Sequence, residues 1–171
     1  MKDFRIVTYL AGWNGEKGME KLRYDCLDQI NYAFAIPTEE GDVLPFPDPD
    51  FVHKVVNEAH AHNVQVMISV GGWSWQDVPL EATFEKATET PEKTARLAKA
   101  IVDVVDEYDF DGADIDWEYP RVHSAKANEA LYELPETGRG GIYKNSMISV
   151  LIMCISLTGV LYLRKYTGIK S

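Results

Sequence analysis

The chain has 171 residues, of which 46% are hydrophobic and 26% charged, an ordinary composition for a soluble globular protein. Its 27 Asp and Glu outnumber its 17 Lys and Arg, and the formal net charge of −10 argues against nucleic acid or an anionic membrane as a partner. Cys26 and Cys154 form neither a disulfide framework nor a metal-ligand spacing. The first residues lack the apolar segment of a secretory signal, so we expect either an intracellular protein or a secreted one whose leader is missing.

The pattern of apolar residues predicts alternating strands and helices. In chain order we expect a strand over 4–11, a short helix around 19–24, a strand over 28–36, a loop over 37–49, a helix from Asp48-Pro49, a strand over 64–70, a helix from Thr90-Pro91 and a strand over 113–118. This order predicts an α/β fold with parallel strands and crossover helices. Ligands bind at the carboxyl ends of such strands, where Trp13 follows the first strand and Gly71-Gly72-Trp73 the third.

Four acidic residues mark the last of these strands, at positions 111, 114, 116 and 118. Strict alternation from 113 to 118 places Asp114, Asp116 and Glu118 on one face of a strand, about 6–7 Å apart at neighbouring steps. The apolar residues between them point the other way, into packing. Three carboxylates over an apolar reverse face indicate a site.

Three interpretations of the acids compete. Calcium is suggested by Glu107-x-Asp109-x-Asp111-Gly112 with Glu118 six positions on, which fits the spacing of an EF-hand loop. Against it, the first position is Glu, and Pro120 stands where the exiting helix must run. The second interpretation is a solvated acidic strand end without a function.

The third interpretation, which we favour, is acid chemistry on carbohydrate. A general acid at neutral pH needs a raised pKa, and neighbouring carboxylates raise it by repulsion. Aromatic residues that could cover sugar rings stand beside the acids, namely Trp73, Trp75, Trp117 and Tyr119. The histidines suggest no role, since His60 and His62 are two apart and face different ways.

The same residues carry a resemblance to a known family. Asp111-x-x-Asp114-x-Asp116-x-Glu118 resembles the DxxDxDxE motif of glycoside hydrolase family eighteen, the chitinase family. Ser69-Val70-Gly71-Gly72 resembles its SxGG motif, and residues 28–35 resemble its second strand. The similarity covers about residues 4–134. It implies a (β/α)8 TIM barrel, of which the chain supplies roughly the first four β/α units, so we expect a barrel half over 1–134 and a divergent tail over 135–171.

The resemblance also implies a mechanism, the substrate-assisted retaining hydrolysis of β-1,4-linked N-acetylglucosamine. Glu118 would be the proton donor and later the base, Asp116 would orient the acetamido group, and Asp114 would share a proton with Asp116. Asp111 and Ser69 are carried over as supporting hydrogen-bond partners. The candidate sugar contacts are Tyr9, Phe34, Gly71, Gly72, Trp73, Ser74 and Tyr119. Tyr9 and Phe34 could equally belong to the barrel core.

The resemblance implies chitin or N-acetylglucosamine oligosaccharides as partner and no metal or organic cofactor. A chitin-binding lectin of the same fold is an alternative, although such a protein would normally have lost the acid at Glu118. An inactive truncated fragment, with or without a membrane tether, is another.

The sequence departs from the family after Leu134, and no counterpart of strands five to eight is found. Residues 147–163 contain no charge and are followed by Arg164-Lys165. That length is at the lower limit for a membrane-spanning helix, whose C-terminus would then lie in the cytoplasm. The segment would also suit one or two buried strands. A foreign or frame-shifted end on a truncated gene is the interpretation we favour, because a complete barrel typically needs about 250 residues.

Overall fold

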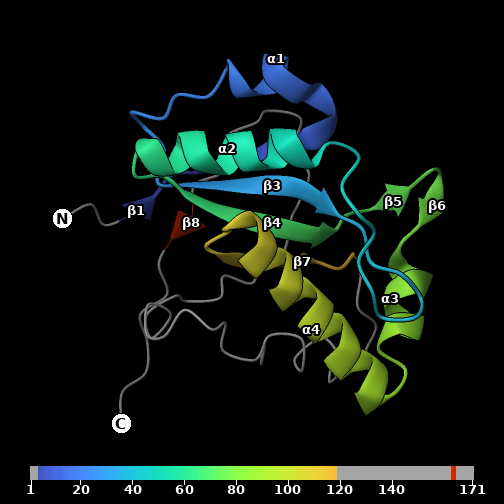
Figure 1. Ribbon diagram of the computed structural model, residues 1–171. Coiled ribbons are helices and arrows are strands. Elements are labelled where there is room, and N and C mark those ends of the chain that lie inside the picture. Colours follow the sequence, from blue (N-terminus) through green and yellow to red (C-terminus); the bar gives the residue numbers. More distant parts are fainter. Residues whose placement is uncertain (1–3, 119–162, 165–171) are drawn as a thin grey trace, which may run out of the picture.

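The computed structural model describes residues 4–118 and 163–164 (Figure 1). Its main body is a four-stranded sheet in which every neighbouring pair of strands is parallel. In spatial order the strands are β2 (Val7–Ala11), β3 (Gln29–Ala35), β4 (Gln65–Gly71) and β7 (Gly112–Asp116). Spatial order follows chain order, as in the first part of a TIM barrel. The predicted parallel α/β fold is confirmed.

Helices connect the strands, and two of them begin where the sequence predicts. The helices are η1 (Gly12–Asn14), α1 (Gly15–Met19), α2 (Pro49–Ala61), α3 (Glu81–Ala87) and α4 (Pro91–Tyr108). Asp48 caps α2 by accepting the backbone N–H of Phe51 at 3.0 Å. Thr90 caps α4 by accepting the N–H of Lys93 at 3.3 Å. In both helices proline stands in the first turn, where its missing N–H costs nothing.

The hydrophobic core lies between the sheet and its helices. α2 packs on β4, α4 packs on β7, and the two helices contact each other (Figure 1). Alternate residues of the strands enter this core, among them Ile30, Tyr32, Val66, Ile68, Val70 and Ile115. The helices contribute residues at helical spacing, including Val52, Val55, Val56, Leu97, Ile101 and Val105. The residues between those core positions therefore face the other side of the sheet.

Three parts of the chain differ from the expectation. The first α-helix, α1, spans Gly15–Met19 rather than 19–24. It was not predicted there because Gly15 and Gly18 have poor helix propensity. β7 ends at Asp116, so Glu118 lies beyond the strand instead of on it. A hairpin of β5 (Ser74–Trp75) and β6 (Val78–Pro79) and the helix α3 were not predicted.

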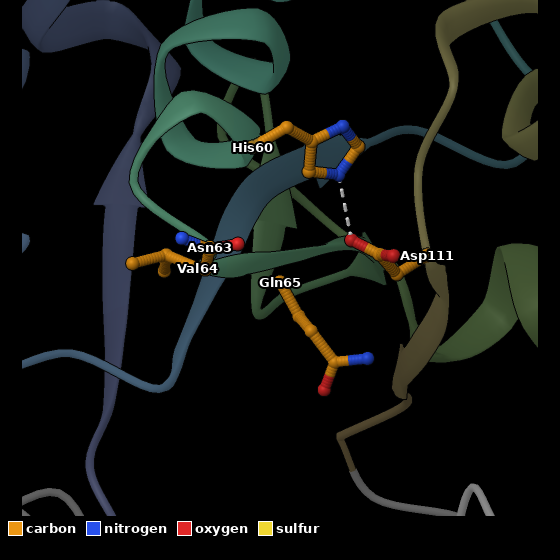
Figure 2. Close-up of a pocket in the computed structure, with 5 residues that line it drawn as sticks. All are labelled: His60, Asn63, Val64, Gln65 and Asp111. Carbon is orange, nitrogen blue, oxygen red and sulfur yellow. Dashed lines mark hydrogen bonds and ion pairs between the residues drawn. The ribbon is translucent and has the colours of Figure 1, made fainter.

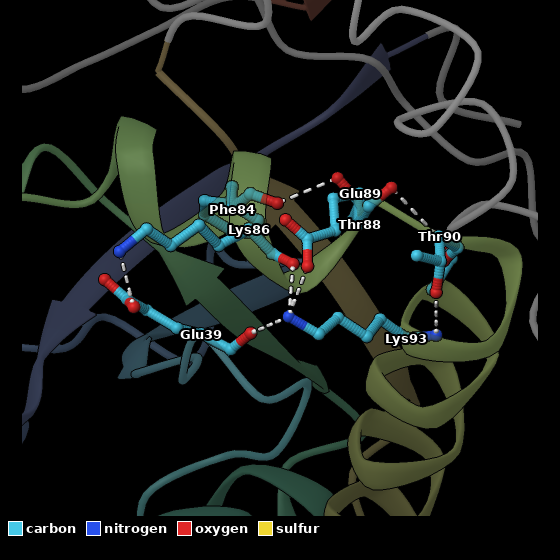
Figure 3. Close-up of polar contacts among 8 residues, drawn as sticks. Glu39, Phe84, Lys86, Thr88, Glu89, Thr90 and Lys93 are labelled. Carbon is cyan, nitrogen blue, oxygen red and sulfur yellow. Dashed lines mark hydrogen bonds and ion pairs between the residues drawn. The ribbon is translucent and has the colours of Figure 1, made fainter.

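A small polar network fixes the junction of α3 and α4 (Figure 3). The ammonium group of Lys93 donates to the carbonyl oxygens of Glu39 and Lys86, each at 3.3 Å, and pairs with Glu89 at 2.8 Å. Lys86 pairs with Glu39 at 2.7 Å. These contacts tie the loop after β3 to both helices and so hold α3 beside the carboxyl ends of the strands.

A second, two-stranded sheet pairs β1 (Phe4–Arg5) with β8 (Leu163–Arg164) antiparallel. Within the described residues, none of the helices combines the length and the apolar character that crossing a bilayer requires. The predictions for Tyr119, for the tail over 135–171 and for the apolar run 147–163 fall almost wholly outside the described residues.

Candidate active site

Asp114 is the centre of a partly buried hydrogen-bond cluster. Its Oδ2 accepts the Tyr9 hydroxyl at 2.8 Å and the Asn31 side-chain amide at 2.9 Å. The Ser69 hydroxyl donates to the same oxygen. Ser69 is fully buried and Asn31 is 5% exposed. Buried polar groups need partners, and an anionic acceptor gives the strongest bonds, so the cluster suits a carboxylate at Asp114.

The register of the sheet brings these residues together. Ser69 lies directly beside Asp114 on the neighbouring strand, and Tyr9 lies beside Asn31. The Tyr9 hydroxyl nevertheless reaches Asp114 from β2, the far edge of the four strands. This contact is compatible only with a sheet that is strongly curved, with the cluster on its concave face. Burial and the charge of Asp114 raise the pKa of the Tyr9 hydroxyl, which therefore stays a donor.

Asp116 follows two residues on and lies in a different environment. Its neighbour on β4 is Gly71, which has no side chain to offer a hydrogen bond. Burial, the charge of Glu118 and the charge of Asp114 together raise the pKa of Asp116 to about 7. The backbone carbonyl of Asp116 accepts the N–H of Gly72 at 2.9 Å, which joins the two predicted motifs directly.

Glu118 lies just past the end of β7 and is half-buried. Its Oε2 is shielded from solvent and has no hydrogen-bond partner among the described residues. The preceding residue, Trp117, is 6% exposed and stacks on Phe84 of α3, with ring centroids 5.0 Å apart. The stacking fixes the backbone directly before Glu118.

Exposed aromatic side chains surround this end of the sheet. Trp13 is 74% exposed and its ring lies 6.1 Å from that of Phe34. Trp73, which directly follows the two glycines, is 59% exposed. Phe34 is half-buried because the pairing of β3 with β4 shifts by one residue there, a bulge that re-aims its side chain. Ser74 is exposed at the start of the hairpin.

Asp111 lies at the other end of β7, away from these residues. Its Oδ2 accepts the backbone N–H of Val66 at 2.8 Å and is 2.8 Å from His60 Nε2, a contact drawn in Figure 2. Asp109 lies 3.9 Å from the other ring nitrogen of His60. Asp111 therefore joins the end of α2 to the start of β4 beside a shallow hollow, and the structure does not bring it to Asp114. Nothing in the local sequence indicates this contact.

Two further points concern the predicted set. Within residues 4–118, no group of His, Cys, Asp and Glu is arranged to hold a metal ion, including the acids of the EF-hand-like spacing. Asn31 is a member of the Asp114 cluster that was not predicted from the sequence. The only feature of the sequence that could have indicated its role is that it is a polar residue inside a strand whose apolar pattern predicts burial.

Comparison with known proteins defines the class. The sequence model of "Glycosyl hydrolases family 18" matches residues 5–154, and the chain belongs to this family. A solved chitinase from Rhizomucor miehei has the same fold, with a TM-score of 0.62 and 30% identity over 77% of this chain and 44% of its own. The family and the TIM-barrel class were both predicted from the two motifs.

Two curated relatives are similar to this chain in sequence. A "chitinase-like effector" from Moniliophthora roreri is 33% identical over 115 residues, 66% of this chain. An "Endochitinase" from Manduca sexta is 28% identical over 131 residues, 68% of this chain. The chain spans only 27% and 23% of the length of these two proteins. The family match over residues 5–154 includes both motifs.

Proposed function

We propose that this chain is a chitinase-type glycoside hydrolase that cleaves β-1,4-linked N-acetylglucosamine by substrate-assisted retaining hydrolysis. The observation that carries the proposal is that three carboxyl groups near one another in the sequence differ in their hydrogen-bond partners, and that the pKa of one of them is raised. Asp114 accepts three hydrogen bonds, the pKa of Asp116 is raised to about 7, and one oxygen of Glu118 has no hydrogen-bond partner within residues 4–118. Family membership supports the same chemistry.

Glu118 is proposed to be the general acid and base. It would give its proton to the glycosidic oxygen as the bond from that oxygen to the anomeric carbon breaks. The carbonyl oxygen of the substrate's own acetamido group would bond to the anomeric carbon and form an oxazolinium ion. Water would then attack this carbon, breaking its bond to the acetamido oxygen, and lose a proton to the Glu118 carboxylate, which restores the acid and retains the configuration.

Asp116 and Asp114 are proposed to act on the acetamido group and its charge. Asp116 would accept the acetamido N–H and so aim the carbonyl oxygen at the anomeric carbon. A proton shared with Asp114 lets Asp116 change its charge as the positive charge develops. Since its pKa lies near 7, this change costs little at neutral pH.

The exposed aromatic residues are proposed to bind the sugar chain. Trp13 and Trp73 present their rings to solvent beside the carboxyl groups, a surface suited to the apolar faces of pyranose rings. The chemistry described here requires chitin or its oligosaccharides as substrate and no metal or organic cofactor. Tyr119 is carried over as a further contact from the resemblance alone.

The test is cleavage and binding of N-acetylglucosamine oligomers by the whole chain. Glu118→Gln is expected to abolish cleavage and to leave binding within a few-fold of wild type. Glu20→Gln removes the same charge at an exposed position and is expected to change neither. Cleavage by Glu118→Gln at the wild-type rate would refute the proposal.

A second candidate function is sugar binding without turnover. It is favoured by the relative from Moniliophthora roreri, which is described as chitinase-like. Binding of the oligomers by the wild-type chain, with no release of shorter products over days, would select this function. The absence of both binding and cleavage would exclude the two candidates together.

A further inference from the structure

Phe84 of α3 packs against the ends of β4 and β7. It is fully buried, and its ring stacks on that of Trp117 with an interplanar angle of 11°. A Cβ atom on Gly71 would lie 2.7 Å from Phe84 Cε2 and 2.9 Å from its Cζ, so the ring lies directly against this glycine. Phe84 therefore contacts both the neighbour of Asp116 on β4 and the residue between Asp116 and Glu118.

Contacts outside the site fix where α3 lies (Figure 3). The Lys93 ammonium group donates to the Lys86 carbonyl oxygen in the last turn of α3 and to the Glu39 carbonyl oxygen in the loop after β3, each at 3.3 Å. The Thr88 hydroxyl donates to the carbonyl oxygen of Phe84 itself at 2.8 Å. A shift of α3 would carry the Phe84 ring with it, so the junction around Lys93 helps to set where the ring lies.

A smaller side chain at position 84 would move its neighbours in a definite direction. Phe84 and Trp117 both belong to the hydrophobic core, so Trp117 would move into the space that a smaller residue leaves. Asp116 is held by its pairing with Gly71. Glu118 would follow Trp117 toward the core, and its distance from Asp116 would increase.

We propose that Phe84 is a positioning residue that sets where Glu118 lies relative to Asp116. It acts through the ring of Trp117, and the Lys93 junction in turn fixes Phe84. The inference rests on the proposed function in one respect, that Glu118 is the acid of the hydrolysis. The packing of the rings is independent of that function.

The carboxyl group of Asp116 reports its distance from Glu118 without any turnover. Burial, then the charge of Glu118, then the charge of Asp114 raise the pKa of Asp116. A larger distance from Glu118 weakens the repulsion between the two carboxylates, so Asp116 should ionise at lower pH.

The experiment is a pH titration of the Asp116 carboxyl carbon by NMR in the whole chain. Phe84→Leu is expected to lower the midpoint by about 0.3–0.5, as for two charges whose separation grows by about 1–2 Å from about 6 Å at an effective dielectric constant of about 20. The matched control is Phe110→Leu, the same change at a fully buried ring that lies near those of Tyr32 and Tyr108. It should cost stability and leave the midpoint unchanged.

Glu118→Gln separates the effect of charge from that of burial. On its own it should lower the Asp116 midpoint, because the repulsion disappears, and Phe84→Leu added to it should lower the midpoint no further. A midpoint that Phe84→Leu lowers equally with Glu118 or with Gln at that position would report a loss of burial around Asp116 and would overturn the proposal. A midpoint that neither Phe84→Leu nor Glu118→Gln changes would overturn it too.

If Phe84→Leu does not fold, Lys93→Met decides. It removes the ammonium group of the junction, keeps most of the apolar stem, and should lower the Asp116 midpoint in the same way but by less. Lys99→Met is its control on the same helix, because the Lys99 ammonium group pairs with Asp103 one turn on, and it should leave the midpoint unchanged. An unchanged midpoint in Lys93→Met would count against the proposal.

Cleavage of N-acetylglucosamine oligomers is measured separately. Phe84→Leu is expected to lower kcat about 10- to 100-fold and to keep KM within about 2-fold, because a misplaced acid affects the transition state more than binding. A wild-type chain that cleaves nothing but whose Asp116 midpoint responds to Phe84→Leu as expected would refute the hydrolase and support the positioning role. A chain that cleaves the oligomers but whose midpoint does not respond would do the reverse.

Discussion

The structure predicts that Gly71, at the end of β4, cannot be replaced by a larger residue without a loss of stability. Gly71 has a φ of +114°, and a Cβ atom added there would lie 2.5 Å from the carbonyl oxygen of Asp116 and 2.7 Å from the Phe84 ring. Gly15 provides the matched control, since it also has a positive φ, +52°, and a Cβ there would meet nothing within 4 Å. Replacing each by alanine separates backbone strain from crowding.

The magnitudes follow from these two environments. A side chain held in a backbone conformation that only glycine adopts readily costs about 1–3 kcal/mol, and this cost applies to both variants. Overpacking adds about 1–3 kcal/mol, and it applies to Gly71→Ala alone, because the Asp116 carbonyl belongs to a strand of the sheet and cannot move freely. We therefore expect the free energy of unfolding to fall by about 1–3 kcal/mol in Gly15→Ala and by about 2–6 kcal/mol in Gly71→Ala.

Urea unfolding at equilibrium measures both losses on the same scale. The same variants should differ at the site, since only Gly71→Ala displaces the end of β7. In a one-bond proton–nitrogen NMR spectrum, the Gly72 amide that bonds to the Asp116 carbonyl should shift in that variant alone. Equal losses of stability in the two variants, with no shift of Gly72, would refute the reasoning.

Three further predictions concern the acids and the rim. The folded chain holds a proton on Asp116 up to about pH 7 while the unfolded chain releases it near pH 3.8, so this group's contribution lowers stability as pH rises through that window. Asp116→Asn should therefore raise the free energy of unfolding by about 1–2 kcal/mol at pH 8, a value reduced because Asp116 is partly exposed to solvent. At pH 3.5 the same substitution should change the free energy of unfolding little. The control Asp106→Asn, at an exposed position, should change it little at either pH. Asp111→Ala should cost about 1–3 kcal/mol in urea unfolding because it leaves the Val66 N–H without its acceptor, and Asp111→Asn, which keeps an oxygen, should cost less; equal losses would count against this role. Trp73→Ala should weaken oligomer binding about 2- to 12-fold by calorimetric titration, as expected for one aromatic contact; unchanged affinity would remove this residue from the binding surface.

The sequence predicts well the features that depend on residues close together in the chain. The caps at Asp48 and Thr90 each depend on a hydrogen bond to a residue three positions on, and both helices begin there. The alternation around Asp114 and Asp116 predicts the strand in the same local way. Parallel pairing follows from the order of elements, so the rim at which Gly71 and Asp116 meet is predicted too.

What the sequence did not reveal depends on register between distant strands. Asn31 is 83 residues from Asp114, and their contact exists only because β3 and β7 pair with β4 in one register. His60 is 51 residues from Asp111, and the contact depends on where α2 ends relative to β7. A one-residue slip in either strand pairing would remove these contacts without changing any local pattern.

The acids of β7 lie in different environments because their neighbours on β4 differ. Asp114 faces Ser69, whose hydroxyl donates to it. Asp116 faces Gly71, which has no donor, and the crowding around that position excludes any side chain that could supply one. Burial raises the pKa of Asp116, the charges of Glu118 and Asp114 raise it further, and Gly71 offers no side-chain donor to offset them. The glycine thus does more than relieve strain, because it keeps a side-chain donor away from the carboxyl group next to Glu118.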